Sequence, residues 1–232
     1  MSRKLYAVLR MPNFIHEINN SHKTNFIILS AGENKTRGQS GTKSLLNVSK
    51  NKKLLDLQIQ TIKRYFKDAD VIFATGFQSN ILTHYLLEKY PDVRIIENKR
   101  YKTTTPLESL RLCLNCSIRG DTYIIYGDKY FDIDSISFSD SSFPVIVEST
   151  HESFSKSNLG LVYQNNQLKS ISYGVKKKWG QIFYIPQKLF YNFRNQVNGC
   201  NKKYYNTFDI INLVANEYEF KVHKSKNVKE LL

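Results

Sequence analysis

The chain has 232 residues, of which 41% are hydrophobic and 13% aromatic, and 34 Lys and Arg against 20 Asp and Glu give a net charge of +14. This length and composition fit one α/β domain with a substantial core, and no linker divides the chain. No apolar run approaches the roughly 20 residues that span a bilayer and no signal peptide is recognisable, so we expect a cytoplasmic protein without a membrane partner.

The basic charge has two functional explanations and one trivial one. A basic surface holds nucleic acid through phosphate contacts, or it attracts small anions such as nucleoside triphosphates and phosphosugars. Lysine and asparagine also recur along the whole chain, which is the amino-acid usage of an AT-rich genome. No nucleic-acid-binding motif is recognisable. The charge alone therefore does not choose between these explanations.

The first 24 residues form an N-terminal extension whose role the sequence leaves open. Residues 5–9 predict a strand or a short helix, and a turn at residues 11–13 leads to a second apolar segment at residues 14–18. The extension fits either an added edge element or a partner-docking segment.

The first strong signal is an apolar run at residues 26–29, which predicts a strand buried on both faces of a parallel sheet. Ser30, Ala31 and Gly32 follow and let a ligand approach the backbone. Arg37 and Lys43 add positive charge in the same loop. Exposed backbone N–H groups with fixed positive charge are suited to phosphate groups. An ordinary basic turn is the alternative reading.

The next segments alternate between helix and strand. Apolar spacing and flanking residues predict helices at residues 54–66, 79–90 and 106–116, and strands at residues 71–76, 93–97 and 123–126. Cys113 and Cys116 fall within the third helix, and no second cysteine pair completes a zinc site. The odd number of cysteines, with Cys200 as the third, argues against a disulfide framework.

Asp128 is a candidate metal ligand because it follows the strand at residues 123–126 through Gly127. Open α/β sheets bind ligands just beyond the carboxyl ends of their strands. Carboxylate oxygens suit Mg²⁺ that bridges nucleotide phosphates. Gly-Asp is also a common turn sequence, so the position carries more weight than the dipeptide.

The loop resembles the signature of nucleotidylyltransferases that activate sugar phosphates and alcohol phosphates. That signature is an apolar strand, A-A-G-x-G-x-R, a spacer and P-K-x-L, and Ala31-Gly32, Arg37 and Lys43 match it. Residues 126–131 are similar to the family's G-D-x-x-F motif. The second glycine is missing, the loop is one residue longer, and Thr42 replaces the usual proline, so the loop is expected to grip phosphates differently.

The resemblance implies a Rossmann-like three-layer α/β/α nucleotidyltransferase fold with a mostly parallel central sheet, over residues 25–232. It implies catalytic roles for Arg37 on the triphosphate, Lys43 between the reacting phosphates, and Asp128 as the ligand of Mg²⁺. It also implies a set of nucleotide-binding residues: Ser30, Ala31, Gly32, Glu33, Gly76, Gln78, Thr103, Thr104 and Thr105. The threonines fit helix capping equally well, and Gln78 fits an exposed loop.

The second metal-binding aspartate of the family is missing from its expected place near the C-terminus. His223 stands there, and a neutral imidazole is a poor ligand for Mg²⁺ but binds transition metals. A second metal site at His223 would thus be weakened, shifted toward Mn²⁺, or lost. A surface histidine without a metal is the alternative.

Several middle segments are similar to a subset of the family found in bacteriophage genomes and related to phosphocholine cytidylyltransferase-like enzymes. In this resemblance Lys178, Trp179 and Gln181 face the phosphorylated acceptor, with lysine neutralising its phosphate and the indole forming an apolar or cation–π wall. A lone tryptophan beside a strand is also commonly a core residue, and a lysine run a solvated face.

Two functional hypotheses remain from the sequence. The first is an Mg²⁺-dependent transferase that moves the NMP group of an NTP, with CTP or UTP favoured, to a phosphorylated sugar or alcohol and releases pyrophosphate. The second is a degenerate relative that binds nucleic acid or a host protein. Retention of Arg37, Lys43 and Asp128 together favours the enzyme.

Overall fold

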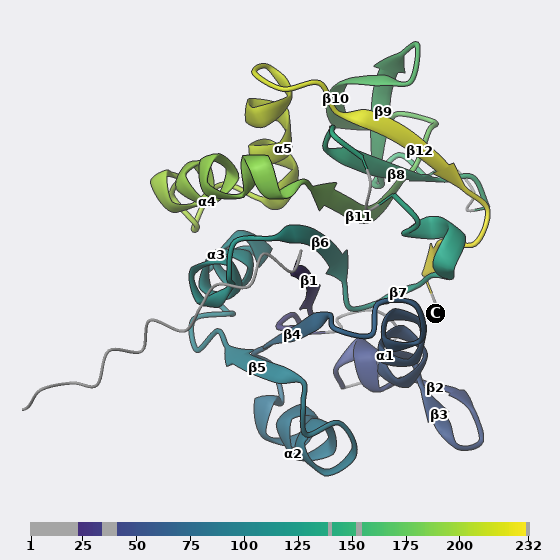
Figure 1. The fold of residues 1–232 in the computed structure, drawn as a ribbon, viewed down its shortest axis with the longest axis vertical. Coiled ribbons are helices and arrows are strands. Elements are labelled where there is room, and N and C mark those ends of the chain that lie inside the picture. The colour runs from purple at the N-terminus through teal and green to yellow at the C-terminus, as the bar shows by residue number, and fades with distance from the viewer. Residues whose placement is uncertain (1–22, 34–40, 139–140, 152–154, 231–232) are drawn as a thin grey trace, which may run out of the picture.

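The structure is a computed structural model that describes residues 23–33, 41–138, 141–151 and 155–230. Its centre is a nine-stranded sheet with the order β5-β4-β1-β6-β11-β8-β12-β10-β9 (Figure 1). The strands are β1 (Thr24–Leu29), β4 (Asp70–Thr75), β5 (Arg94–Glu97), β6 (Asp121–Tyr126), β8 (Val145–Ser149), β9 (Leu159–Gln164), β10 (Gln167–Tyr173), β11 (Trp179–Ile185) and β12 (Lys221–Ser225).

Helices cover both faces of this sheet and make a three-layer arrangement. The helices are α1 (Leu54–Tyr65), α2 (Ser79–Lys89), α3 (Pro106–Cys116), α4 (Phe190–Gly199) and α5 (Thr207–Ala215). Apolar side chains of α3, α4 and α5 share one buried cluster with the sheet, and those of α1 and α2 share the cluster on the other face. Because each face has its own core, the expected α/β/α fold is confirmed.

Strand β1 is buried on both faces, as the apolar run predicted. Phe26 and Ile28 point into the α1/α2 cluster, whereas Ile27 and Leu29 point into the α3/α4/α5 cluster. β1 pairs in parallel with β4 on one side and with β6 on the other. The chain leaves β1 toward β4 and β5 and returns to β6, so the strand order reverses at β1.

The predicted elements in the first half match the observed ones within a few residues, and α3 matches its predicted bounds. The second half is less regular. Only β11 and β10 run against the direction of the other strands in the sheet, so the sheet is mixed but mostly parallel. The register of β11 against β8 shifts between Trp179 and Phe183, where Gln181 has a φ of 57°.

Two small strand pairs lie outside the main sheet. β2 (Asn47–Ser49) and β3 (Lys52–Lys53) form a hairpin before α1. The pair β7 (Lys129–Tyr130) and β13 (Lys229–Glu230) joins the segment after β6 to the C-terminal segment. This second pair sets Glu230 opposite Lys129, one residue from Asp128.

Short 3₁₀ turns complete the described structure, namely η1 (Lys43–Leu45), η2 (Ile133–Ser135) and η3 (Gln187–Leu189). The predicted elements at residues 5–9 and 14–18 lie outside the described residues. Within the described ranges, no helix has the length and apolar character needed to cross a membrane.

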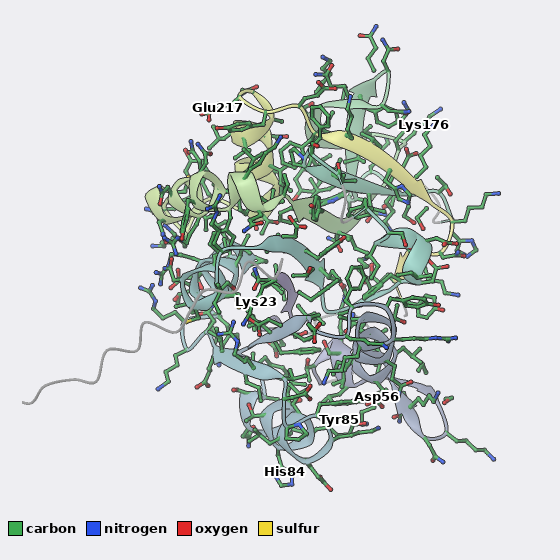
Figure 2. The ribbon with its side chains drawn as sticks, in the orientation of Figure 1. Lys23, Asp56, His84, Tyr85, Lys176 and Glu217 are labelled. Atoms are coloured by element: carbon green, nitrogen blue, oxygen red, sulfur yellow. The ribbon has the colours of Figure 1, made fainter. Side chains whose placement is uncertain are left out.

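A buried carboxylate joins α1 to α2 beneath the sheet (Figure 2). Asp56 is fully buried and accepts hydrogen bonds from the Lys53 amide at 2.8 Å, the Tyr85 hydroxyl at 2.8 Å and the Tyr90 hydroxyl at 2.9 Å. The Lys89 ammonium lies 3.0 Å away. Burial would raise the pKa of Asp56, but these donors outweigh burial and lower it.

The substitution Asp56→Asn should destabilise the fold by about 2 to 4 kcal/mol, because it removes the charge that four donors share inside the protein. Urea unfolding of the variant and the wild type at neutral pH measures this loss. Since the folded pKa of Asp56 is lowered, its stabilisation is present above the unfolded pKa of about 3.9 and is lost as the pH falls through the folded pKa.

Asp92→Asn is the matched control, because the Asp92 side chain is 67% exposed and pairs with Lys63 at the surface. Its free energy of unfolding should stay within about 0.5 kcal/mol of the wild type. Equal losses of unfolding free energy in Asp56→Asn and Asp92→Asn would contradict the conclusion that the buried Asp56 carboxylate stabilises the fold.

Candidate functional site

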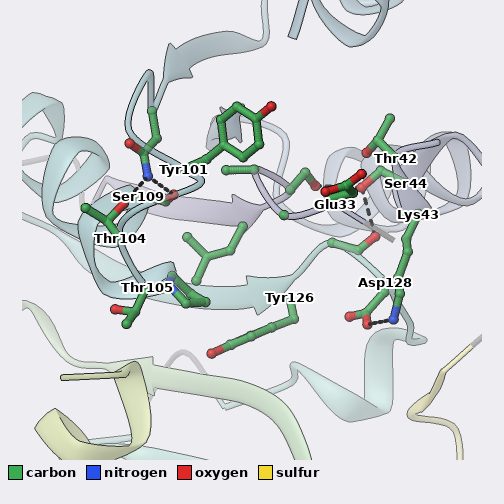
Figure 3. A pocket seen from close by; sticks show the side chains of 17 residues that line it. Glu33, Thr42, Lys43, Ser44, Tyr101, Thr104, Thr105, Ser109, Tyr126 and Asp128 are labelled. Atoms are coloured by element: carbon green, nitrogen blue, oxygen red, sulfur yellow. Dashed lines mark hydrogen bonds and ion pairs between the residues drawn. The ribbon is translucent and has the colours of Figure 1, made fainter. Parts of the chain in front are cut away.

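A cavity of about 330 Å³ opens at the carboxyl ends of β1 and β6 (Figure 3). This is the point where the strand order reverses, which is where open α/β sheets bind ligands. Its walls come from the end of β1, the loop before η1, the segment before α3, and the end of β6. The lining residues are Leu29, Ser30, Ala31, Gly32, Glu33, Thr42, Lys43, Ser44, Asn98, Tyr101, Thr104, Thr105, Pro106, Ser109, Tyr126, Gly127 and Asp128.

A short hydrogen-bond junction fixes the η1 turn to the sheet. The hydroxyl groups of Ser30 and Ser44 lie 2.6 Å apart, and the Ser44 hydroxyl donates to the Gly127 carbonyl at 3.0 Å. A Cβ at Gly127 would lie 2.0 Å from the Ser30 Oγ, so glycine is required for this approach. The junction therefore holds Lys43 beside the end of β6.

Lys43 bridges two carboxylates from distant parts of the chain. Its Nζ lies 3.0 Å from Asp128 Oδ2 and 2.8 Å from Glu230 Oε1, and Lys129 Nζ lies 3.0 Å from Glu230 Oε2. Burial opposes the charge on Lys43, but Asp128 and Glu230 outweigh burial and raise its pKa. Burial likewise opposes the charge on Glu230, and Lys129 and Lys43 overcome it and lower the pKa of Glu230 to about 2.

Two polar oxygens on the cavity wall have no hydrogen-bond partner within the described residues. Asp128 Oδ2 accepts a hydrogen bond from Lys43, but the second oxygen of this carboxylate, Oδ1, is buried and unpaired. The other atom is Thr42 Oγ1, from a residue that also lines the cavity. Buried polar atoms are normally paired, so these atoms are suited to a ligand, a metal ion or water. Thr42 stands where the resembled signature has proline, and thus adds a hydroxyl that proline would not provide.

Hydroxyl and amide groups line the other end of the cavity (Figure 3). The buried Asn98 side chain donates to Thr104 Oγ1 at 3.2 Å and to Ser109 Oγ at 3.1 Å. Thr105 caps α3 by accepting from the Leu107 amide at 3.3 Å. Capping is therefore established for Thr105, while Thr104 and Thr105 also lie on the cavity wall.

Three residues expected at the nucleotide do not line the cavity. Gly76 packs behind the wall, because a Cβ there would lie 2.7 Å from the Ala31 carbonyl oxygen. Gln78 precedes α2 with a φ of 49°, and the Thr103 hydroxyl donates to the Arg100 carbonyl. Gly76 thus packs against Ala31 behind the cavity wall, whereas Gln78 and Thr103 are not part of that wall.

The three residues expected at the acceptor phosphate lie in different surroundings in the structure. Lys178 lies near the charged cluster: burial and then Lys129 lower its pKa, while Glu230 and Asp128 oppose that change. Trp179 is buried and contacts Tyr126, with ring centroids 5.8 Å apart, so it packs behind a cavity residue. Gln181 lies at the irregular register of β11 and does not line the cavity.

The structure does not bring His223 to Asp128. Val222 belongs to the α3/α4/α5 cluster, and because side chains alternate along a strand, His223 points to the opposite face. There its Nε2 lies 2.9 Å from the Asp134 carbonyl oxygen and its ring contacts Phe138. His223 does not line the cavity, and its expected pairing with Asp128 at one metal stays a prediction. Arg37 lies outside the described residues.

Sequence reasoning missed several residues of the site. Glu230 reaches Lys43 through the β7–β13 pair, a tertiary contact that no local pattern announces. Asn98 and Ser109 are joined across the entry to α3. Tyr126 had a signal, because it directly precedes Gly127 and Asp128 at the end of a strand.

Gly127→Ala should destabilise the fold by about 1 to 3 kcal/mol, because the added methyl group would displace the Ser30–Ser44 junction. Urea unfolding provides the measurement. The control is Gly199→Ala at the end of α4, where a Cβ would meet no described atom within 4 Å. The free energy of unfolding of that variant should lie within about 1 kcal/mol of the wild-type value, and any difference should be a stabilisation. A Gly127→Ala variant as stable as this control would contradict the claim that the Ser30–Ser44 junction requires glycine at position 127.

No protein-family model matches the sequence, and no curated protein matches it either. Solved structures do match. A CTP:phosphocholine cytidylyltransferase from Streptococcus pneumoniae is 18% identical with a TM-score of 0.70, over 90% of this chain and 93% of that chain. A nucleoside-diphosphate-sugar pyrophosphorylase from Vibrio cholerae is 11% identical with a TM-score of 0.68, over 88% and 94%.

An inositol-1-phosphate CTP transferase from T. maritima is 11% identical with a TM-score of 0.66, over 90% of this chain and 89% of that chain. These likenesses extend over nearly the whole length of both partners, while the identities are low. They confirm at the level of the fold the resemblance that the loop and Gly127-Asp128 motifs predicted. The chain has the fold of the nucleotidylyltransferases of sugar phosphates and alcohol phosphates.

Proposed function

We propose that this chain is a nucleotidyltransferase that moves the NMP group of an NTP to a phosphorylated sugar or alcohol and releases pyrophosphate. The observation that carries the proposal is the contact of Lys43 with Asp128 on the wall of the cavity at the reversal of strand order. A fold alone hosts many functions, so the argument rests on this site within that fold.

In the proposed reaction, an oxygen of the acceptor phosphate attacks the α-phosphorus of the NTP. A new P–O bond forms, and the bond between the α-phosphorus and the bridging oxygen to the β-phosphate breaks. The electron pair leaves with pyrophosphate. The acceptor phosphate is already an anion, so no strong general base is required. Catalysis then depends on positioning and on neutralising charge.

Lys43 is the side chain best placed for this task. The junction of Ser30, Ser44 and Gly127 fixes its turn, and the raised pKa keeps its ammonium charged at neutral pH. A fixed charge in a partly buried site stabilises negative charge better than a mobile charge in water. Lys178 lies near the same cluster and is suited to the acceptor phosphate. Arg37 keeps its proposed role on the triphosphate.

Mg²⁺ fits the donor at Asp128. The carboxylate supplies hard oxygen ligands, and its buried Oδ1 has no partner within the described residues. Bound there with the nucleotide, the ion would neutralise charge on the phosphates. The described part of the chain contains no cluster of three or more His, Cys, Asp or Glu suited to a metal. The phosphates of the nucleotide would therefore supply further ligands to the Mg²⁺ ion.

The opposite end of the cavity would hold the nucleoside. Its amide and hydroxyl groups, from Asn98, Thr104 and Ser109, are suited to hydrogen bonds with a base or ribose, and Tyr101 provides an aromatic surface. Two of the similar structures carry CTP in their names, as a cytidylyltransferase and as a CTP transferase. We therefore propose CTP as the first candidate for the nucleotide substrate, followed by UTP.

Lys43→Ala should lower the rate of pyrophosphate release by about 100-fold or more, because it removes preorganised charge beside the reacting phosphates. The assay measures pyrophosphate with each of the four NTPs and a panel of phosphorylated sugars and alcohols, in Mg²⁺ and separately in Mn²⁺. The control is Lys169→Ala on β10, an exposed lysine that contacts Gln167 outside the cavity. It should turn over like the wild type.

Asp128→Asn should lower turnover at least as strongly, and high Mg²⁺ should not restore it. Normal turnover in Lys43→Ala would contradict the proposed chemistry. No turnover by the wild type over the whole panel, together with salt-sensitive binding to DNA or RNA, would instead favour the binding protein that the net charge of +14 suggests.

A further inference from the structure

One hydroxyl group on the cavity wall differs from the others in having no hydrogen-bond partner. Six serine and threonine side chains line the cavity. Those with partners among the described residues are Ser30, Ser44, Thr104, Thr105 and Ser109. Thr42 is the sixth; the residue is 3% exposed, and its Oγ1 is buried with no partner in the part of the chain that the structure describes.

We propose that the Thr42 hydroxyl binds a phosphate oxygen of the nucleotide, to which it donates a hydrogen bond beside the Lys43 ammonium. The inference rests on the proposed function for the nucleotide, but the binding of a phosphate group follows from the site itself. It gives threonine at this position a chemical role that proline, without a hydroxyl, would not have.

The backbone at Thr42 does not require threonine. Its φ of −78° and ψ of 130° are values that proline also adopts. Its carbonyl accepts from the Leu45 amide at 3.0 Å, a bond that any residue at this position would make. A buried hydroxyl without a partner lowers stability. A ligand that accepts a hydrogen bond from Thr42 would remove this cost.

The turn that carries Thr42 is fixed before any ligand binds. Ser44, two residues later in η1, is bonded to Ser30 and to the Gly127 carbonyl. The branched side chain of threonine also has few χ1 rotamers. The hydroxyl is therefore a donor with little freedom to lose on binding, which favours affinity.

The neighbouring charge favours an anion as the partner of this hydroxyl. Thr42 and Lys43 are consecutive residues, and Figure 3 shows them together at one end of the cavity. A hydroxyl donates a stronger hydrogen bond to a charged oxygen than to a neutral one. A phosphate chain has several charged oxygens, so it can accept from Thr42 and contact the Lys43 ammonium at the same time.

The test titrates the full-length protein with inorganic triphosphate and Mg²⁺ by isothermal titration calorimetry. Thr42→Val keeps the shape of the side chain but removes the hydroxyl, so it should bind triphosphate at least about tenfold more weakly than the wild type. Thr42→Ser keeps the hydroxyl and should bind within about threefold of the wild type. The control is Thr83→Val on α2, a half-buried threonine outside the cavity wall, which should bind like the wild type.

Thermal unfolding without ligand provides a second readout. Because the Thr42 hydroxyl has no partner in the described residues, Thr42→Val should unfold at the wild-type temperature or above it. Weaker triphosphate binding in a protein of equal or greater stability is the signature of a ligand-binding hydroxyl. A hydroxyl that only stabilises the fold would give the reverse, namely a lower unfolding temperature with unchanged binding.

Five results would overturn the proposal: no triphosphate binding by the wild type, unchanged binding by Thr42→Val, a lower unfolding temperature of Thr42→Val, weak binding that Thr42→Ser does not restore, or an equal loss in Thr83→Val. Should Thr42→Val fail to fold, Thr42→Ala takes its place in the titration and should show the same weakening.

These readouts separate the phosphate contact from the proposed reaction. Triphosphate binding that depends on the Thr42 hydroxyl, in a protein that turns over no NTP, would keep the contact and reject the transferase. Turnover by the wild type with triphosphate binding unchanged in Thr42→Val would keep the transferase and reject the contact.

Discussion

The hydrogen-bond junction between Ser30, Ser44 and Gly127 is the constraint on which the site depends. It joins the residue after β1, the η1 turn and the residue after β6 within one buried contact. β1 and β6 are neighbouring parallel strands, so their carboxyl ends lie side by side. With the turn fixed there, the Lys43 ammonium lies 3.0 Å from Asp128 Oδ2. This anchoring fixes the described end of the loop, where Lys43 and Ser44 lie, beside the carboxyl ends of the two strands.

The first half of the fold could be predicted because its signals are local. Apolar runs mark β1, β4 and β6, and their full burial in a parallel sheet leaves the sequence no polar alternation to obscure them. Asp128 stood out because it follows such a run through Gly127, and Lys43 because it is a basic residue of the loop after β1 that matches the resembled signature. The second half mixes parallel and antiparallel strands with a shifted register in β11, and no local pattern records which strand neighbours which.

Several expected site residues do not line the cavity for one physical reason, which is that distance along the chain does not report the direction of a side chain. His223 lies at the expected place in the sequence, yet the alternation of β12 turns it toward Phe138 and away from the cavity. Gly76 and Trp179 pack behind Ala31 and Tyr126 and do not line the cavity. Glu230 was missed because only the β7–β13 pairing brings it to Lys43.

The charged cluster combines an acidic pair with several lysines of a basic chain, which bears on the proposed binding of anions. Lys43 contacts Asp128 and Glu230, Lys129 contacts Glu230, and Lys178 lies near this cluster, so three lysines accompany two carboxylates. The carboxylates prevent the lysines from repelling one another in a partly buried place, and the excess favours a polyphosphate over a neutral molecule. In the proposed function, the net charge of +14 would draw such anions from a distance, and Lys43 would meet their phosphates in the cavity at the carboxyl ends of β1 and β6.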